Sequence, residues 1–391
     1  MAVLFGAEKI ITPFEVLTKK DIQIDYKKGI RIYPASEKTE FLKEEIIGCK
    51  GKIIAPGFID IHTHGGSGIA FGSGNLEDGL LSYSRWAATT GVTGFLLSIS
   101  GPSPDAICEI LKGYAAVFKE NREWPGAIPL GIHLEGPYLN PKKHGAFRTS
   151  WLRQPSIEEL KRILDSAGGW IRQVSLAPEL EGAGDAAAFL ADEGITAALG
   201  HSDADYETAS AALEGDFRHV THTYNAQSAF HHRSPGVAGA VLASNRITAE
   251  LIGDAHHIHP AAMQILYRCL GAERIILISD AMPGAGLPDG VYNLMEMEVR
   301  VKNCKATLPD GTLAGSTATM ESALRTLVNK AKIPLQDAVK MASHNPAKCI
   351  VRQENTGHLA NGKSADIVVL NEDLTVYMTI VSGKIVYKHN G

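Results

Sequence analysis

The sequence predicts an α/β fold, a (β/α)₈ barrel with a small β-sandwich domain built from both chain termini. Apolar strand candidates alternate with amphipathic segments from residue 58 to about 345, which is typical of such barrels. The two ends of the chain instead contain short period-2 segments and no helical stripe. A doubly wound sheet is the alternative, but it usually has a Gly-rich phosphate loop after its first strand, and none follows here.

The chain of 391 residues is long enough for about two to three domains. We expect residues 1–57 and 351–391 to form one discontinuous β-sandwich domain, because both contain segments such as DIQIDY and TVYMTIV. Residues 58–350 then form the barrel, with a β insertion near 288–313 that turns at Asp310-Gly311.

Eight buried strands are predicted for the barrel. Helices are expected between them, for example behind Ser103-Pro104, behind a capping box of Ser156 and Glu159, and over 317–343. The predicted strands are 58–64, 94–99, 128–135, 171–177, 195–201, 219–225, 247–254 and 274–280.

Composition excludes several classes of protein. The net charge of −5 leaves no basic footprint for nucleic acid, and no apolar run reaches the ~20 residues of a membrane span. The first twenty residues lack the charged region and cleavage site of a signal peptide. Five scattered cysteines without a CxxC pair favour a reducing, cytoplasmic location.

One motif has the sequence pattern of a nucleotide-binding loop but is not followed by the helix that such a loop requires. Residues 357–364, GHLANGKS, fit the phosphate-loop pattern G-x-x-x-x-G-K-[ST]. That loop requires a helix after it, so that the helix N-terminal amides face phosphate. Here Lys363 and Ser364 run into ADIVVL, a predicted strand, so we do not expect nucleotide binding.

Polar residues end the first predicted strand. Asp60, His62 and His64 alternate with Ile59 and Ile61, and a period of two places the polar side chains on one face. The isoleucines are then expected to face the helices, and the two histidines to point into the mouth of the barrel.

Other strands end on the same residue types. Glu135 ends strand three, His201 strand five, His222 strand six and Asp280 strand eight, and all are expected to meet at one end of the barrel. Imidazole and carboxylate ligands suit Zn²⁺, Fe²⁺ or a similar divalent ion. Such an ion lowers the pKa of bound water toward ~7, and a neighbouring Asp can take up and return its proton. The set predicts metal-dependent hydrolysis of an amide, ester or amidine.

The remaining histidines are given ordinary roles. His133 lies two residues deeper than Glu135 and is interpreted as a supporting or core residue. His219 has the opposite parity from His222 and is not expected to be a ligand. The others are interpreted as loop, surface or packing residues.

The motifs PGFIDIHTHG, HLEGPYLNPKKHGA, LAPE, LGHSDA, THTYNA, SPGVAGA, ISDAM, LAGS and NPA together resemble those of the N-acetylglucosamine-6-phosphate deacetylase family of the amidohydrolase superfamily. HTHG alone marks only the superfamily, whereas HLEGP, GHSxA and HxYNA are specific to the deacetylase branch. The match is collinear across essentially the whole chain. It implies the barrel with its small β domain, an amino-sugar phosphate substrate and a homodimer.

The resemblance also implies roles for the polar cluster. Glu135, His201 and His222 match the ligands of the principal metal. His62 and His64 match members that carry a second ion, so one or two ions per subunit are expected. Asp280 matches the catalytic aspartate and is also counted among the metal ligands.

Substrate contacts carry over as well. Arg233 matches an arginine that binds the 6-phosphate and can come from the neighbouring subunit, which suits a planar guanidinium. The other matching positions, which contact the sugar or its phosphate or cover them, are Ala146, Asn225, Ala226, His257, Leu313 and Ala314.

The chain departs from the family at one place. Many members have G-A-H after the EGP loop, and here Phe147 and Arg148 follow Gly145-Ala146. His144, three positions earlier, is a candidate replacement for the missing histidine, and Arg148 is a candidate phosphate contact.

Three hypotheses follow for the activity. The first is hydrolysis of N-acetylglucosamine 6-phosphate to glucosamine 6-phosphate and acetate, in amino-sugar catabolism and recycling of cell-wall sugars. The second is deacetylation of another amino-sugar phosphate, such as N-acetylgalactosamine 6-phosphate, or another amidohydrolase reaction. The third is a barrel that holds its metal without catalysis, against which the presence of Asp280 argues.

Overall fold

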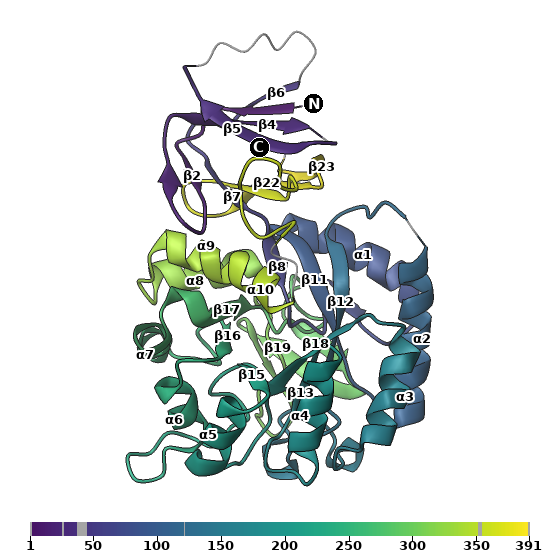
Figure 1. Ribbon diagram of the computed structural model, residues 1–391. Helices are drawn as coiled ribbons and strands as arrows, with labels where there is room; N and C mark the ends of the chain where they lie inside the picture. Colours follow the sequence, from purple (N-terminus) through teal and green to yellow (C-terminus); the bar gives the residue numbers. More distant parts are fainter. Residues whose placement is uncertain (1, 26, 37–44, 121, 351–353, 390–391) are drawn as a thin grey trace.

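The computed structural model describes residues 2–25, 27–36, 45–120, 122–350 and 354–389. Its centre is an eight-stranded parallel sheet in the order β17-β16-β15-β14-β13-β12-β11-β8, which confirms the predicted barrel (Figure 1). The two edge strands approach each other just beyond their carboxyl ends. There Thr63 and Ala281 form a parallel bridge, and the Asp280 amide donates to the His62 carbonyl at 2.9 Å. The circle of strands therefore closes beside the predicted metal ligands.

Each predicted barrel strand is present. The observed strands are β8 (Phe58–Asp60), β11 (Val92–Ile99), β12 (Ile128–Glu135), β13 (Ile171–Leu176), β14 (Thr196–Leu199), β15 (Phe217–Val220), β16 (Thr248–Ile252) and β17 (Ile275–Ile278).

The first strand is shorter than predicted, since it is regular only to Asp60. Ile59 and Ile61 do not join the large apolar cluster that connects the strands to the surrounding helices. They pack instead in a small cluster with Ile276 and Ile278, which alternate with the helix-facing residues of β17. The predicted orientation of these isoleucines is therefore wrong. The direction of His62 and His64 comes from the bend after β8 and not from a continued period of two.

Helices surround the barrel and begin where capping residues predict. Ser103 accepts from the Ala106 amide at the start of α2 and Ser156 from the Glu159 amide at the start of α3, although the Glu159 carboxylate accepts from Tyr138. The helices around the barrel are α1 (Leu76–Thr89), α2 (Pro104–Lys119), α3 (Ile157–Ala167), α4 (Ala183–Asp192), α5 (Tyr206–Glu214), α6 (Gly236–Ala243), α7 (Pro260–Leu270), α8 (Met320–Asn329), α9 (Leu335–Ala342) and α10 (His344–Cys349).

Strands from both chain ends build two small sheets at one end of the molecule, next to α8–α10 (Figure 1). They share an apolar cluster that includes Ile22 and Ile24 of the first sheet and Ile54, Ile367 and Ile380 of the second. The first sheet has the order β5-β4-β1-β6, and the second β23-β22-β21-β7-β2-β3.

The first of these sheets contains β1 (Ala2–Phe5), β4 (Lys20–Asp25), β5 (Gly29–Pro34) and β6 (Glu45–Gly48). The second contains β2 (Lys9–Ile11), β3 (Val16–Leu17), β7 (Ile53–Pro56), β21 (Ile367–Leu370), β22 (Val376–Val381) and β23 (Lys384–Lys388). The domain division at 57/58 and 350/351 stays a prediction, and residues 351–353 lie outside the described residues.

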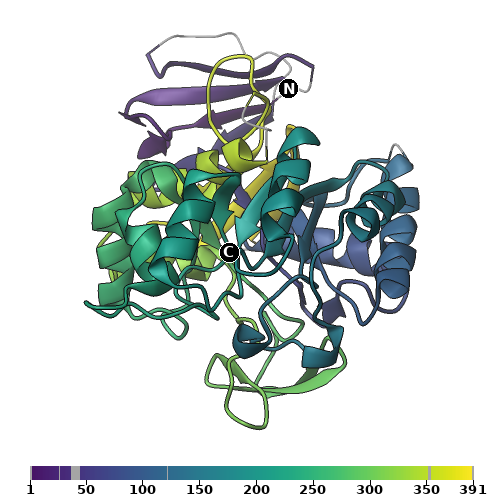
Figure 2. The same cartoon turned by 60° about the horizontal axis from the view of Figure 1, so that its bottom comes forward.

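The expected β insertion is present as β18 (Gly290–Leu294), β19 (Met297–Lys302) and β20 (Lys305–Thr307). It projects from the end of the barrel opposite the terminal sheets (Figure 2). A short ribbon of β9 (Gly65–Gly66) and β10 (Ile69–Ala70) follows His64. Insertion and ribbon therefore both belong to the end at which the polar residues gather.

The structure also bears on the GHLANGKS motif, the cysteines and the expected lack of a membrane span. Lys363 and Ser364 precede strand β21, as predicted, so the GHLANGKS segment lacks the helix of a phosphate loop. All five cysteines are free thiols. Among the described residues, none of the helices has the length and apolar character needed to cross a membrane.

Candidate active site

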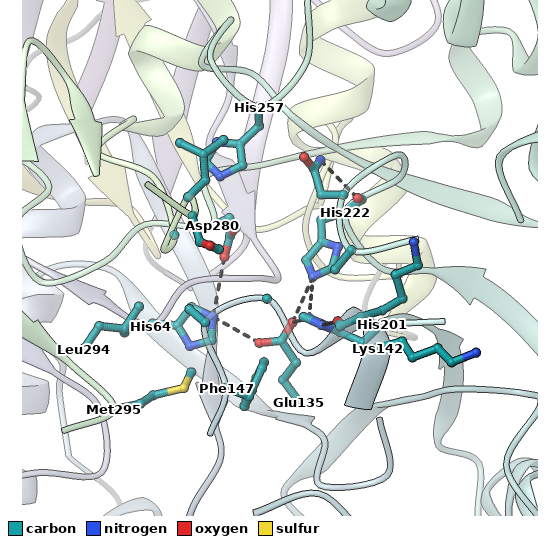
Figure 3. A pocket seen from close by; sticks show the side chains of 18 residues that line it. His64, Glu135, Lys142, Phe147, His201, His222, His257, Asp280, Leu294 and Met295 are labelled. Atoms are coloured by element: carbon teal, nitrogen blue, oxygen red, sulfur yellow. Dashed lines mark hydrogen bonds and ion pairs between the residues drawn. The ribbon is translucent and has the colours of Figure 1, made fainter. Parts of the chain in front are cut away.

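A cavity of about 330 Å³ opens at the carboxyl ends of the barrel strands. His64, Glu135, His201, His222 and Asp280 lie along its wall and point toward one another (Figure 3). All five side chains are buried. The sequence placed these residues at five strand ends, and the fold brings them to one place.

Two groups of three buried side chains that could bind a metal ion meet in this cavity. Glu135, His201 and His222 form the first, with ligand atoms all within 4.8 Å of one another. The Nε2 atoms of the two histidines are 3.1 Å apart, and Oε1 of Glu135 lies 3.3 Å from Nε2 of His201 and 3.1 Å from that of His222.

The second group consists of His62, His64 and Asp280. Oδ1 of Asp280 lies 3.5 Å from Nε2 of each histidine. Glu135 connects the two groups, because its Oε2 lies 3.1 Å from Nε2 of His64 and its Oε1 faces the first group. The arrangement is therefore one continuous polar centre with two triads.

The backbone at this centre is strained. His201, His222 and Asp280 have φ angles of 49°, 28° and 49°, a region that costs a non-glycine residue of order 1–3 kcal/mol. Ala226 (φ 48°) shares this conformation. Strain at three of the six ligand positions indicates that the fold holds these side chains against the local preference of the chain.

Neighbouring groups orient two of the imidazoles. Nδ1 of His201 donates to the Lys143 carbonyl at 2.7 Å, which leaves Nε2 free as a ligand. Nδ1 of His62 lies 2.8 Å from Oε2 of Glu250, a fully buried carboxylate on β16. Sequence reasoning missed Glu250, although a lone acidic residue within the apolar strand ITAELI was a signal.

Attraction between the buried imidazoles and carboxylates outweighs the effect of burial on their pKa values. Burial alone would raise the pKa of Glu135, but the charge of His62 and contacts with His201 and His222 hold that pKa well below its usual range. Burial would lower the pKa of His62, whereas Glu250 and Glu135 raise it well above its ordinary value. The carboxylates therefore create a negative potential that attracts positive charge to this point.

The donor set fits a divalent metal. Nε2 of His62 is buried and has no hydrogen-bond partner among the described residues, yet it faces carboxylates of Glu135 and Asp280. Nε2 atoms of His201 and His222 face each other across one carboxylate oxygen. Converging imidazole and carboxylate atoms of this kind are ligands for zinc, iron and related ions. Both triads found among the described residues are of this kind.

His133 and His219 lie outside both triads, and both contact buried polar residues. His133 contacts Ser98 Oγ (3.0 Å) and Ser175 Oγ (2.7 Å) and packs edge-on against His62. Burial lowers its pKa to about 3, so it is neutral. His219 is not in either triad, as expected, but its Nε2 lies 3.1 Å from Oε1 of Glu250.

Most predicted substrate residues line the cavity, namely Ala146, Asn225, Ala226, His257 and Leu313. His257 has a buried partner, since its Nδ1 lies 2.6 Å from Oδ2 of Asp254. Burial would lower the pKa of His257, but the hydrogen bond and charge of Asp254 raise it.

Three predicted substrate residues do not line the cavity of their own chain. Arg233 is exposed on a loop and contacts His232 at 2.7 Å. Nδ1 of His144 lies 2.9 Å from the Phe147 carbonyl, and Ala314 is buried beside the cavity among apolar neighbours.

The cavity also includes residues that the sequence did not single out as contacts. Lys142 and Lys143 contribute positive charge, and Leu294 and Met295 of the β insertion contribute apolar surface. Phe147 occupies the position of the family histidine and packs edge-on against His201 at 5.1 Å. No sequence signal identified the insertion residues, because their approach depends on how the insertion folds back.

Fold and site together define a metal-dependent hydrolase of the amidohydrolase class, and residues 53–386 match the amidohydrolase family. The chain is 39% identical over 336 residues to the N-acetylglucosamine-6-phosphate deacetylase of Vibrio furnissii, covering 85% of this chain and 83% of that one. It is 36% identical to the N-acetylgalactosamine-6-phosphate deacetylase of Escherichia coli O157:H7, covering 85% and 88%.

A solved structure shows the same architecture. It is a variant of N-acetyl-D-glucosamine-6-phosphate deacetylase from Mycobacterium smegmatis in complex with N-acetyl-D-glucosamine 6-phosphate, with a TM-score of 0.91, 32% identity and 99% coverage of both chains. The present chain belongs to the N-acetylglucosamine-6-phosphate deacetylase family of the amidohydrolases.

Proposed function

We propose that this chain hydrolyses the acetamide of N-acetylglucosamine 6-phosphate, giving glucosamine 6-phosphate and acetate. The observation that carries the proposal is the pair of linked triads at the base of a cavity in a chain of this family. The triads supply the chemistry for amide hydrolysis, and the cavity beside them has basic residues for a phosphate.

In this proposal Glu135, His201 and His222 hold the principal divalent ion, zinc or iron, and His62, His64 and Asp280 are the ligands of a second. An ion held there would polarise the acetyl carbonyl and activate the attacking water. Each subunit holds two ions if the second triad binds its ion at cellular metal concentrations, and one ion if it does not.

Asp280 is assigned the proton transfers. Its carboxylate accepts a proton from the attacking water and then donates it to the departing amine, so that no free amide anion forms. Its place on the cavity wall, with Oδ1 3.5 Å from Nε2 of both His62 and His64, supports this role. The left-handed φ of Asp280 holds the carboxylate at this position.

Groups around the cavity are assigned to the substrate. Asn225, Ala226 and His257, which line the cavity, are assigned to the sugar phosphate, and Leu313 with the adjoining Ala314 to the loop that covers the sugar. Nδ2 of Asn225 donates to backbone carbonyls of its own turn, including that of His222 at 3.2 Å, which fixes the turn next to a ligand. Ala146 contributes to the wall beside Phe147.

We further propose a homodimer in which Arg233 of the partner subunit reaches the phosphate. Support comes from the exposed loop that carries Arg233 and from Phe230 beside it, which is 58% exposed. His144 and Arg148 are less suited to replace the family histidine, because His144 turns to the Phe147 carbonyl and exposed Arg148 donates to the Glu296 carbonyl. A cytoplasmic location is also proposed.

The alternative substrate is N-acetylgalactosamine 6-phosphate, favoured by the similarity to the E. coli O157:H7 enzyme. The test is acetate release from both sugar phosphates and from unphosphorylated N-acetylglucosamine, with metal content measured on the same samples. We expect the highest kcat/KM for N-acetylglucosamine 6-phosphate. A higher value for the galactosamine epimer would transfer the assignment, and equal rates without phosphate would refute the phosphate contacts.

A further inference from the structure

A buried carboxylate below the active site has no part in the reaction described above. Glu250 lies on β16, fully buried inside the barrel, in a place where apolar side chains usually fill the interior. An ionised group there is costly unless every oxygen has a partner. Its partners therefore indicate what it is retained for.

The two oxygens of Glu250 face different parts of the barrel. Oε2 lies 2.8 Å from Nδ1 of His62 and accepts from the backbone amide of His222 at 2.9 Å. Oε1 accepts from Nε2 of Gln173 at 3.0 Å and lies 3.1 Å from Nε2 of His219. One oxygen thus contacts the metal-ligand residues, and the other contacts the barrel interior away from them.

The contact to His62 determines which nitrogen of that ring is free. With the Nδ1 proton donated to Glu250, Nε2 of His62 carries the lone pair, and Nε2 is the atom that faces Glu135 and Asp280. The Lys143 carbonyl does the same for His201. Carboxylate partners of this kind fix the tautomer and raise the basicity of a ligand imidazole.

The contact to His222 acts on the backbone instead. His222 has φ 28°, a strained conformation, and its amide is held by the same Oε2 that holds His62. One carboxylate oxygen therefore connects a ring of the second triad with the main chain of the first.

We infer that Glu250 is a positioning residue for both triads, which orients His62 for metal binding and holds the left-handed turn at His222. This inference rests on the proposed metal site. It assigns to Glu250 no contact with substrate.

The test compares Glu250→Gln with His219→Gln, a matched substitution that changes only the partner of Oε1. An amide at position 250 carries no charge, and only one of its two ends accepts. If its oxygen faces His62, the tautomer of that ring is kept but the charge that raises its basicity is lost. If the amide nitrogen faces His62, that ring must accept through Nδ1 and carry its proton on Nε2, which blocks the ligand. Zinc affinity and stoichiometry are measured by competition with a chromophoric chelator, alongside Tm of the metal-free protein.

We expect Glu250→Gln to bind the ion at the His62 triad about 10- to 100-fold more weakly, with a smaller loss at the His222 triad. His219→Gln should keep wild-type affinity. Wild-type zinc affinity in Glu250→Gln, together with a lowered Tm, would show a role in folding only and overturn the inference.

A measurement on the wild type covers the case in which Glu250→Gln does not fold. In zinc-loaded protein with ¹⁵N-labelled histidine, we expect a hydrogen-bonded Nδ1 proton that disappears in His62→Gln; an Nε2 proton on His62 would overturn the inference. Acetate release is followed in the same samples. Zinc binding without acetate release would refute the proposed substrate and leave the Glu250 comparison intact, whereas a wild type that binds no zinc would overturn both.

Discussion

The side chains at the open end of the barrel and those between the two terminal sheets are both well buried, but they differ in type. The first are mostly charged or polar, and the second are mostly aliphatic. At the barrel end, the buried ring of His62 contacts three buried carboxylates, those of Glu135, Glu250 and Asp280. Between the terminal sheets the cluster is almost entirely aliphatic, with residues such as Ile24 fully buried.

The difference in residue type indicates that the barrel end serves activity and the terminal sheets serve stability. Buried charge and left-handed backbone cost folding free energy, and the barrel end retains both where the ligands are. Aliphatic burial contributes folding free energy, and the terminal sheets contain little else in their shared cluster. Substitutions at the first region should therefore change turnover, and those at the second should change stability.

The largest effect is expected for Asp280→Asn. Loss of the proton acceptor should lower kcat about 10²- to 10⁴-fold, measured by acetate release. Tm and the ion held by Glu135, His201 and His222 should stay close to wild type, because the amide has nearly the same shape. An ion at the triad of His62, His64 and Asp280 should bind more weakly, because one carboxylate ligand is lost. Turnover near the wild-type value would remove Asp280 from the mechanism.

Ile24→Ala tests the other region. Truncation of this fully buried side chain on β4 should lower the free energy of unfolding by about 2–5 kcal/mol, measured by urea titration. The kcat of the folded protein should not change. Ile24→Val, which leaves a smaller cavity, serves as the graded control at about 0.5–1.5 kcal/mol.

Arg233→Ala tests whether Arg233 of the partner subunit takes part in phosphate binding. Loss of a charge-assisted phosphate contact should raise KM for the sugar phosphate about 10- to 100-fold, with no change for the unphosphorylated sugar. Arg246→Ala, at an exposed arginine paired with Glu214, is the control. Similar KM changes in both variants would exclude a phosphate role for Arg233.

The smallest effect concerns a partly buried carboxylate outside the active site, that of Asp366. Burial raises the pKa of Asp366, which accepts from the Ser382 amide at 2.8 Å, above its ordinary value of 3.8. Ionisation therefore lowers stability as the pH rises from 3.8 through the raised pKa, and the cost is complete above it.

Asp366→Asn should remove that pH dependence, since the amide oxygen can still accept from Ser382. The variant should gain stability relative to wild type between pH 3.5 and pH 7, by about 1.4 kcal/mol for each unit of pKa shift. Parallel stability curves for the two proteins across that range would contradict the assignment.

Local patterns in the sequence predicted much of this architecture. Strand positions followed from apolar runs, and the starts of α2 and α3 followed from Ser103 and Ser156, because capping involves only the first turn. Ligand identity followed from residue type at strand ends. The orientation of Ile59 and Ile61 was predicted wrongly, because β8 ends at Asp60 and the alternation ends with it.

The sequence by itself determined which elements form, which side chains are available as ligands and which family the motifs resemble, since these depend on residue type and near neighbours. Tertiary structure alone decided that Glu135 connects two triads, that Glu250 contacts ligands from two strands, and that Arg233 lies outside its own cavity. Each of these depends on contacts between residues far apart in the chain, and those distances exist only once β8 and β17 have closed the barrel.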